Sequence, residues 1–228
     1  MFDAIARRYD ALNHILSAGL DRRWRREAVR ALALSPGDRV LDMCTGTADL
    51  AIEAATSTAG HAGQVIGIDF SSEMLKLAQR KVRDRGLAGR VHIARGDATR
   101  MPVADAAMDA AMVGFGIRNV LDPARTCAEF HRVLRPAGRL AILEFGMPRI
   151  PGIRALYFWY FQHVLPRVGR LISRHGDAYS YLPLSMMEFP AGDAFAAMLK
   201  TAGFADVRYR SLALGLVYLY IARKPATP

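Results

Sequence analysis

Three aspartates stand at or near the ends of successive apolar runs in this sequence, and their carboxylates can bind hydroxyl, amino or cationic groups. They are Asp42, Asp69 and Asp97. Asp69 follows Gly46 by about 20 residues, the spacing at which an acidic side chain accepts hydrogen bonds from ribose hydroxyls. Asp97, beside Ala98, is expected to meet an adenine amino group. Aspartate also forms turns and caps helices, so that alternative stays open for each of the three.

The loop VLDMCTGTADLA, residues 40–51, contains a single glycine, Gly46. A dinucleotide-binding loop needs the pattern G-x-G-x-x-G so that the backbone can approach a pyrophosphate, and Thr45, Thr47 and Asp49 do not supply it. Asp49 also places a carboxylate in the first helical turn, where it stabilises the helix dipole and repels phosphate. The loop therefore favours a cationic cofactor without phosphate. S-Adenosylmethionine, with its ammonium, sulfonium and ribose, fits that description.

Short apolar runs alternate with segments whose apolar residues recur at helical spacing. Strands joined by crossover helices predict an α/β fold, a mostly parallel sheet with helices on both faces. Ligands of such sheets bind at the carboxyl ends of the strands, so the loops after the first four runs are the expected site. The predicted strands are 39–43, 64–69, 91–95, 109–113 and 140–145, with helices at 47–59, 71–85 and 123–134 between them. Residues 2–33 and 191–201 are further predicted helices, and the β-rich runs 205–211 and 214–222 are expected to pair as an antiparallel hairpin at one sheet edge.

The composition, 52% apolar and 23% charged, indicates one globular domain over residues 1–228. Residues 1–34 are expected to form an N-terminal helical cap. The aromatic and arginine-rich region 148–190 is interpreted as an inserted helical segment that serves the substrate or the membrane. Two cysteines, Cys44 and Cys127, in apolar settings indicate a reducing compartment and predict neither a disulfide nor a metal site.

The sequence predicts no secretory signal and no spanning helix, because no stretch reaches about 18 uncharged apolar residues. The nearest, residues 155–166, is long enough only to lie against a bilayer. The formal net charge is +10, with arginines crowded in residues 22–30. In helical register Arg167, Arg170 and Arg174 share a face next to an apolar one, which suits an anionic membrane surface. A core-facing helix with a solvated basic side is the alternative.

An ordered set of motifs runs along the chain: YDALNHILSAGLDRRWRR (9–26), FGIRNV (115–120), RVLRPAGRLAILEF (132–145), FQHVLPRVG (161–169), DAYSYL (177–182) and AGF (202–204). This set resembles the signatures of the ubiquinone/menaquinone biosynthesis C-methyltransferase family. The similarity covers nearly the whole chain and is far more specific than the strand-helix loop alone. It implies the seven-stranded, Rossmann-like fold of S-adenosylmethionine-dependent methyltransferases. It also implies methylation of a ring carbon in a polyprenylated quinol.

The resemblance also implies which residues hold the cofactor, and two departures from the family pattern accompany it. Gly46 supplies the tight turn of the loop. Gly114 stands where the family often has serine, which removes one hydroxyl contact, and Ala137 replaces the usual glycine of a turn far from the chemistry. The family's cofactor positions fall on Thr47, Asp69, Asp97 and Ala98.

Carbon methylation of a quinol needs a stabilised quinol oxygen, a ring carbon in line with the methyl group and removal of a ring proton. Arg118, with Asn119, is the candidate for orienting the quinol oxygen, directly or through water, because arginine stays protonated; a structural ion pair is the alternative. His163 has the right pKa range for proton transfer, and a packed, hydrogen-bonded histidine is its alternative. Three tyrosines are expected to line the ring pocket: Tyr9, Tyr179 and Tyr181.

The expected partners are S-adenosylmethionine, a polyprenylated demethylquinol and an anionic membrane surface, with no nucleic acid. The loop CTGTAD and the ending YLYIARK resemble those of menaquinone-only members of the family more than those of the dual-function type, which implies demethylmenaquinol as the substrate. A ubiquinone-precursor benzoquinol, or dual specificity, is the first alternative. An RNA or other small-molecule methyltransferase and a non-catalytic nucleotide-binding module are more distant ones. The protein is expected in the cytoplasm, peripherally on the inner face of the cell membrane, and nothing in the sequence specifies an oligomeric state.

Overall fold

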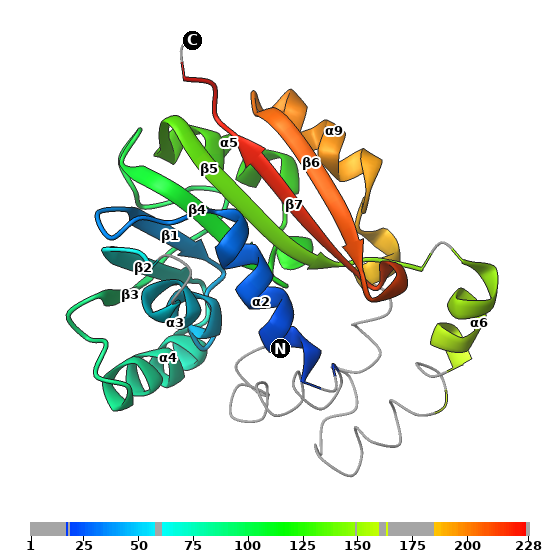
Figure 1. The fold of residues 1–228 in the computed structure, drawn as a ribbon, viewed down its shortest axis with the longest axis horizontal. Coiled ribbons are helices and arrows are strands. Elements are labelled where there is room, and N and C mark those ends of the chain that lie inside the picture. The colour runs from blue at the N-terminus through cyan, green and yellow to red at the C-terminus, as the bar shows by residue number, and fades with distance from the viewer. Residues whose placement is uncertain are drawn as a thin grey trace.

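The computed structural model describes residues 17, 19–57, 61–148, 150–159, 163 and 185–226. Within them, seven strands form one sheet in the order β3-β2-β1-β4-β5-β7-β6 (Figure 1). The pairs from β3 to β5 are parallel, while β7 is antiparallel to both β5 and β6. The strands are β1 (Arg39–Met43), β2 (Gln64–Asp69), β3 (Val91–Arg95), β4 (Met108–Gly114), β5 (Leu134–Phe145), β6 (Ala205–Leu212) and β7 (Val217–Arg223).

Helices cover both faces of the sheet. In Figure 1, α2, α3 and α4 lie on the near face, and α5 and α9 lie behind it. These helices are α2 (Leu20–Ala31), α3 (Asp49–Thr56), α4 (Ser72–Asp84), α5 (Pro123–Val133) and α9 (Asp193–Thr201). Two short 3-10 helices follow β4 and β6, namely η1 (Ile117–Asn119) and η3 (Ala213–Gly215). The predicted α/β architecture, a mostly parallel sheet with helices on both faces, is confirmed.

Alternate residues of β5 pack into two separate cores, one on each face of the sheet. Ala141 and Leu143 join the core that contains residues of α2 and α3. Leu140 and Ile142 join the core that contains residues of α5 and α9. Because side chains of a strand point to opposite faces in turn, a continuous apolar run such as this is required wherever helices cover both faces.

The helices that follow β2 and β4 begin at side-chain caps. Ser71 Oγ accepts the backbone N–H of Met74 at the start of α4. Asp122 Oδ1 accepts the N–H of Arg125 at the start of α5, where Pro123 occupies the first turn. Such caps satisfy amides that have no partner inside the helix. They therefore fix the residues at which the loops after β2 and β4 end and the helices begin.

The strand predictions for 39–43, 64–69 and 91–95 match β1, β2 and β3 residue for residue. The hairpin of β6 and β7 at one sheet edge is also confirmed. Its second strand begins at Val217 rather than at residue 214, because η3 intervenes and Leu214 adopts a left-handed backbone with φ 60°. A positive φ cannot continue a strand, so the apolar run is longer than the strand that it contains.

The described part of the region 148–190 contains α6 (Pro151–Trp159). The Tyr157 hydroxyl donates to Met186 Sδ at 3.2 Å. The arginines of the expected amphipathic face, Arg167, Arg170 and Arg174, lie outside the described residues. Among the helices that are described, none is both long and apolar enough to cross a bilayer.

Ala137 has φ 62°, in the left-handed region that favours glycine. We expect Ala137→Gly to raise the free energy of unfolding by about 0.5–1 kcal/mol, because relief of this strain outweighs the added freedom of the unfolded chain. Urea denaturation measures the change. As a control, Gly138→Ala should destabilise, since its Cβ would lie 2.7 Å from the Arg135 carbonyl oxygen. A lower free energy of unfolding for Ala137→Gly than for the unsubstituted protein would contradict the backbone strain assigned to Ala137.

Candidate functional site

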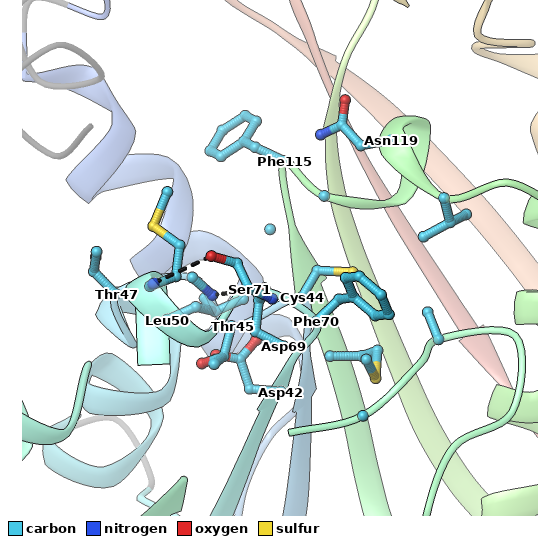
Figure 2. Close-up of a pocket in the computed structure, with 18 of the residues that line it drawn as sticks. Asp42, Cys44, Thr45, Thr47, Leu50, Asp69, Phe70, Ser71, Phe115 and Asn119 are labelled. Carbon is cyan, nitrogen blue, oxygen red and sulfur yellow. Dashed lines mark hydrogen bonds between the residues drawn. The ribbon is translucent and has the colours of Figure 1, made fainter. Parts of the chain in front are cut away.

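A cavity of about 450 Å³ opens at the carboxyl ends of β1 to β4. Figure 2 shows its side chains converging from the loops after β1, β2 and β4. Its lining comes from residues 42–47, 49–50, 69–72, 74, 95–99, 114–116 and 119–121, together with Arg25 of α2. This is the location that the strand pattern predicted. Its volume falls within the range of about 300–1,000 Å³ typical of small-molecule sites.

The loop between β1 and α3 is held in an unusual backbone conformation. Cys44, Gly46 and Ala48 all have positive φ, at 56°, 56° and 68°. For Cys44 and Ala48 this conformation costs about 1 kcal/mol or more each, a strain that collects at functional sites. A Cβ on Gly46 would meet nothing within 4 Å, so this residue borders open space in the cavity. The backbone of the loop is therefore accessible to a ligand.

Asp69 joins the two loops that flank the cavity. Its Oδ2 accepts the N–H of Gly46 at 2.8 Å, and its Oδ1 accepts the N–H of Ser71 at 2.9 Å. Asp69 also lines the cavity, and a carboxylate can accept more than one hydrogen bond at each oxygen. Asp69 therefore both fixes the loop after β1 and presents acceptors that suit ribose hydroxyls.

Asp42 is fully buried in the cavity wall. Its Oδ2 accepts the Thr45 hydroxyl at 2.5 Å, while Oδ1 has no hydrogen-bond partner among the described residues. Burial raises the pKa of Asp42 to about 7, against the lowering effect of the hydrogen bond from Thr45. A buried polar atom without a partner is rare in folded proteins. As part of the cavity wall, the Asp42 carboxyl favours a positively charged group of a bound ligand, and S-adenosylmethionine carries an ammonium.

Asp97 and Ala98 line the cavity beyond β3. Asp97 Oδ1 accepts both the N–H and the hydroxyl of Thr99, at 2.8 Å and 2.9 Å. Those hydrogen bonds hold the pKa of Asp97 below its ordinary value. Asp97 is thus a turn former, as the alternative interpretation had it. Its carboxylate nevertheless stays charged at the cavity edge, where an amino group can meet it.

Thr47 and Asp49 share a cation from α4. Lys81 Nζ donates to Thr47 Oγ1 at 3.0 Å and to Asp49 Oδ1 at 2.7 Å. Thr47 is buried and lines the cavity. Because Lys81 compensates the Asp49 carboxylate, Asp49 repels an anion less than an unpaired carboxylate would. The argument against phosphate then depends mainly on the missing glycines.

Arg118 is directed away from the cavity lining, into an ion pair. Its Nη1 donates to Glu144 Oε1 at 2.6 Å and to the Phe115 carbonyl at 2.8 Å, and its Nε donates to Ser185 Oγ at 3.3 Å. Both charged side chains are almost fully buried. The geometry favours the structural alternative for Arg118, which holds the 115–121 loop in place.

The other predicted substrate residues are only partly brought together. Asn119 lines the cavity, and Figure 2 shows it near Phe115 on the wall opposite Asp69. His163 is exposed, stacks on the Trp159 ring with a centroid separation of 5.8 Å, and is not among the residues that line the cavity. The tyrosines Tyr9, Tyr179 and Tyr181 lie outside the described residues.

Arg25 and Phe115 are among the lining residues that were not predicted from the sequence. Arg25 is buried and its guanidinium lies over the Phe115 ring at 5.7 Å. Phe115 has φ 60° and packs on Trp24 and Phe145. The available signal was the i,i+4 spacing of Asp21 and Arg25 on the same helix face as Trp24. Among the arginines of residues 22–30, this spacing distinguishes Arg25, because its partner Asp21 lies on the apolar face of the helix.

The chain is similar to known methyltransferases in sequence and in fold. A family model described as the ubiE/COQ5 methyltransferase family matches residues 1–224. A Geobacter sp. (strain M21) protein, "Ubiquinone/menaquinone biosynthesis C-methyltransferase UbiE", is 45% identical over 224 residues, covering 98% of this chain and 94% of that protein. A Deinococcus radiodurans protein, "Demethylmenaquinone methyltransferase", is 44% identical over 225 residues, covering 98% and 91%. The crystal structure of a SAM-dependent methyltransferase from Aquifex aeolicus superposes with a TM-score of 0.59 at 19% identity, covering 87% of this chain and 88% of that one.

The raised pKa of Asp42 predicts that, without cofactor, the difference in stability between the unsubstituted protein and Asp42→Asn depends on pH. The folded state holds a proton on Asp42 up to about pH 7, whereas the unfolded state releases it near pH 3.8. Stability from the neutral carboxyl is therefore lost as pH rises. Relative to Asp42→Asn, the free energy of unfolding of the unsubstituted protein should fall by about 3 kcal/mol between pH 5 and pH 8. Denaturant titrations across that range measure this; a difference independent of pH would contradict it.

The buried ion pair of Arg118 predicts a large effect from removing one partner. Glu144→Ala should lower the free energy of unfolding by about 3–5 kcal/mol, because it leaves a buried guanidinium without its counter-ion. The double variant Arg118→Met with Glu144→Leu should regain most of that loss. Glu73→Ala, in an exposed pair with Lys76, is the control and should change stability by about 0.5 kcal/mol or less. Equal effects of Glu144→Ala and Glu73→Ala would refute the structural role.

Proposed function

This chain belongs to the ubiE/COQ5 methyltransferase family, and we propose on that premise that it methylates a ring carbon of a polyprenylated demethylquinol with S-adenosylmethionine. The substrate that we favour is demethylmenaquinol, because the names of both relatives include a menaquinone. A benzoquinol precursor of ubiquinone agrees with only one of those names. It is therefore the second candidate.

The placement of Asp69 at the end of β2 carries the assignment of the cofactor. Its carboxylate binds the amides of Gly46 and Ser71 and lines the cavity at the end of β2, the position from which an acidic side chain binds ribose hydroxyls. The residues that line the cavity also have an excess of negative charge, which suits a ligand with a sulfonium and an ammonium. The charged residues in this lining are Asp42, Asp49, Asp69, Asp97, Arg25 and Arg95.

Each part of the cofactor has residues that would hold it. Asp69 would bind the ribose hydroxyls, and Asp97 with Ala98 would bind the adenine. Gly46 and Thr47 would contact the chain that links ribose to the amino-acid end. When bound, S-adenosylmethionine supplies an electrophilic methyl group on its sulfonium. The protein's contribution is to hold the acceptor carbon close to that methyl group, which replaces a bimolecular encounter by an oriented one.

Asn119 is the described side chain that we assign to the quinol oxygen. Its amide lines the cavity and can donate a hydrogen bond to an oxygen that gains negative charge. Arg118 acts through the loop as a positioning residue, because its guanidinium is held by Glu144. Removal of the ring proton remains assigned to His163 as a proposal, and Tyr9, Tyr179 and Tyr181 are proposed to line the ring.

Apolar side chains at the cavity suit the polyprenyl tail. Leu121 and Phe70 line the cavity and are 101% and 68% exposed, a large apolar exposure for two residues of one site. Arg95 lies beside Phe70, with its Cζ 5.4 Å from the centre of that ring. Apolar and cationic groups together suit an anionic bilayer surface. We propose peripheral attachment there, so that the quinol enters the cavity from the membrane.

The test is methyl transfer from methyl-labelled S-adenosylmethionine to reduced demethylmenaquinol and to the demethylated benzoquinol, each in anionic or uncharged phospholipid vesicles. We expect label on a ring carbon of demethylmenaquinol by mass spectrometry, with faster turnover on anionic vesicles.

Asn119→Ala should lower kcat by about 100-fold with little change in S-adenosylhomocysteine affinity. Lys76→Ala, an exposed substitution on α4, is the control.

The outcomes separate the alternatives. Label on the benzoquinol alone would assign the second substrate, and no transfer to either quinol would refute the proposed function. Equal rates on both kinds of vesicle would refute the attachment to an anionic surface. Normal turnover of His163→Ala would assign proton removal to another group.

A further inference from the structure

Arg25 differs from the other arginines of α2 because it is buried in the wall of the cavity. Its side chain is 11% exposed, whereas Arg22, Arg23 and Arg26 of the same helix are exposed. A buried cation is costly unless its charge is compensated. A cation that lines a ligand cavity is thus a candidate partner for an anionic part of that ligand.

The guanidinium of Arg25 is fixed in orientation by two contacts. Its Nη1 donates to Asp21, four residues earlier on the same helix, and its Cζ lies 5.7 Å from the centre of the Phe115 ring. Its Nη2 is 3.9 Å from Asp49 Oδ2, which is beyond hydrogen-bond range. The Asp49 carboxylate is instead engaged by Lys81 at 2.7 Å. Arg25 therefore lines the cavity without a hydrogen bond from its Nη2 to Asp49.

The order of the strands indicates which part of the cofactor reaches Arg25. The proposed function places adenine at Asp97, after β3, and ribose at Asp69, after β2. Since β1 and β4 come next in the sheet, the amino-acid end would extend across their carboxyl ends. Phe115, directly after β4, is the ring under Arg25. The amino-acid end thus arrives beside the guanidinium.

Asp42 provides a second, independent observation at the same end of the cavity. It lies in β1, is fully buried and has an oxygen without a hydrogen-bond partner among the described residues. An amino-acid end carries one ammonium and one carboxylate. The Asp42 carboxyl in the wall complements the ammonium through space, and the Arg25 guanidinium complements the carboxylate.

We propose that Arg25 binds the carboxylate of the methionine portion of S-adenosylmethionine and so aligns the cofactor along the cavity. This inference rests on the proposed function. It adds a cationic anchor for the cofactor carboxylate. This anchor comes from α2 and not from the loops at the strand ends. Loss of a charge-assisted hydrogen bond in a buried site should weaken binding by about 10- to 100-fold.

The test compares two probes by isothermal titration calorimetry: S-adenosylhomocysteine, and 5′-methylthioadenosine, which lacks the amino-acid end. Arg25→Met, which keeps much of the side-chain volume, should bind S-adenosylhomocysteine about 10- to 100-fold more weakly and 5′-methylthioadenosine with unchanged affinity. Arg25→Lys should recover part of the loss. Arg26→Ala, on the exposed side of the same helix, should bind both probes normally.

A measurement on the unsubstituted protein keeps the inference testable if Arg25→Met does not fold. The carboxyl methyl ester of S-adenosylhomocysteine should bind at least about 10-fold more weakly than S-adenosylhomocysteine itself. Equal affinity for ester and acid, or equal losses for both probes in Arg25→Met, would overturn the inference. If the unsubstituted protein binds no S-adenosylhomocysteine, the proposed function fails instead.

Discussion

The hydrogen bond from the Gly46 amide to the Asp69 carboxylate is the contact on which the cavity depends. It forms because β1 and β2 are parallel neighbours in register, with Met43 opposite Ile68, so their ends meet at one sheet edge. One carboxylate oxygen holds the loop after β1, and the other caps the turn after β2 through Ser71. The strained loop conformation at Cys44 and Ala48 persists because such contacts over-determine it.

This arrangement explains how a loop with a single glycine can serve a nucleoside cofactor. Phosphate sites need exposed amides and several glycines. Here one of the amides that might face a phosphate, that of Gly46, is already bound to a carboxylate. The first turn of α3 carries a second carboxylate, that of Asp49, with its own lysine. The Gly46 amide therefore binds the Asp69 carboxylate instead of a phosphate. Carboxylates at the cavity suit hydroxyl and cationic groups of a ligand.

Much of the fold could be predicted from the sequence, because parallel strands covered on both faces are nearly continuous apolar runs. That signal located β1, β2 and β3 and hence Asp69. Side-chain pairing across the fold could not be predicted in the same way. Arg118 and Glu144 are 26 residues apart and meet only when β4 and β5 pair. The sequence shows two charges there, but not that they neutralise each other.

The same difficulty explains Arg25, which stands among arginines that the sequence does not distinguish by type. Its burial depends on the face that α2 turns to the sheet, and that face is set by Trp24, Ala28 and Val29. Apolar periodicity identifies the face, and the i,i+4 spacing of Asp21 and Arg25 is the one local sign that a cation can lie on it. What that pair does not indicate is that the guanidinium also borders the cavity, which depends on how α2 packs beside β1 and β4.

The central claim is that Asp69 organises a site for an adenosylmethionine-type cofactor, and binding tests it most directly. Calorimetric titration of S-adenosylhomocysteine and of NAD into the unsubstituted protein and Asp69→Ala provides the measurement. The account predicts saturable binding of S-adenosylhomocysteine, a loss of about 10-fold or more in Asp69→Ala, and no comparable binding of NAD. Equal binding by both proteins, or tighter binding of NAD, would contradict it.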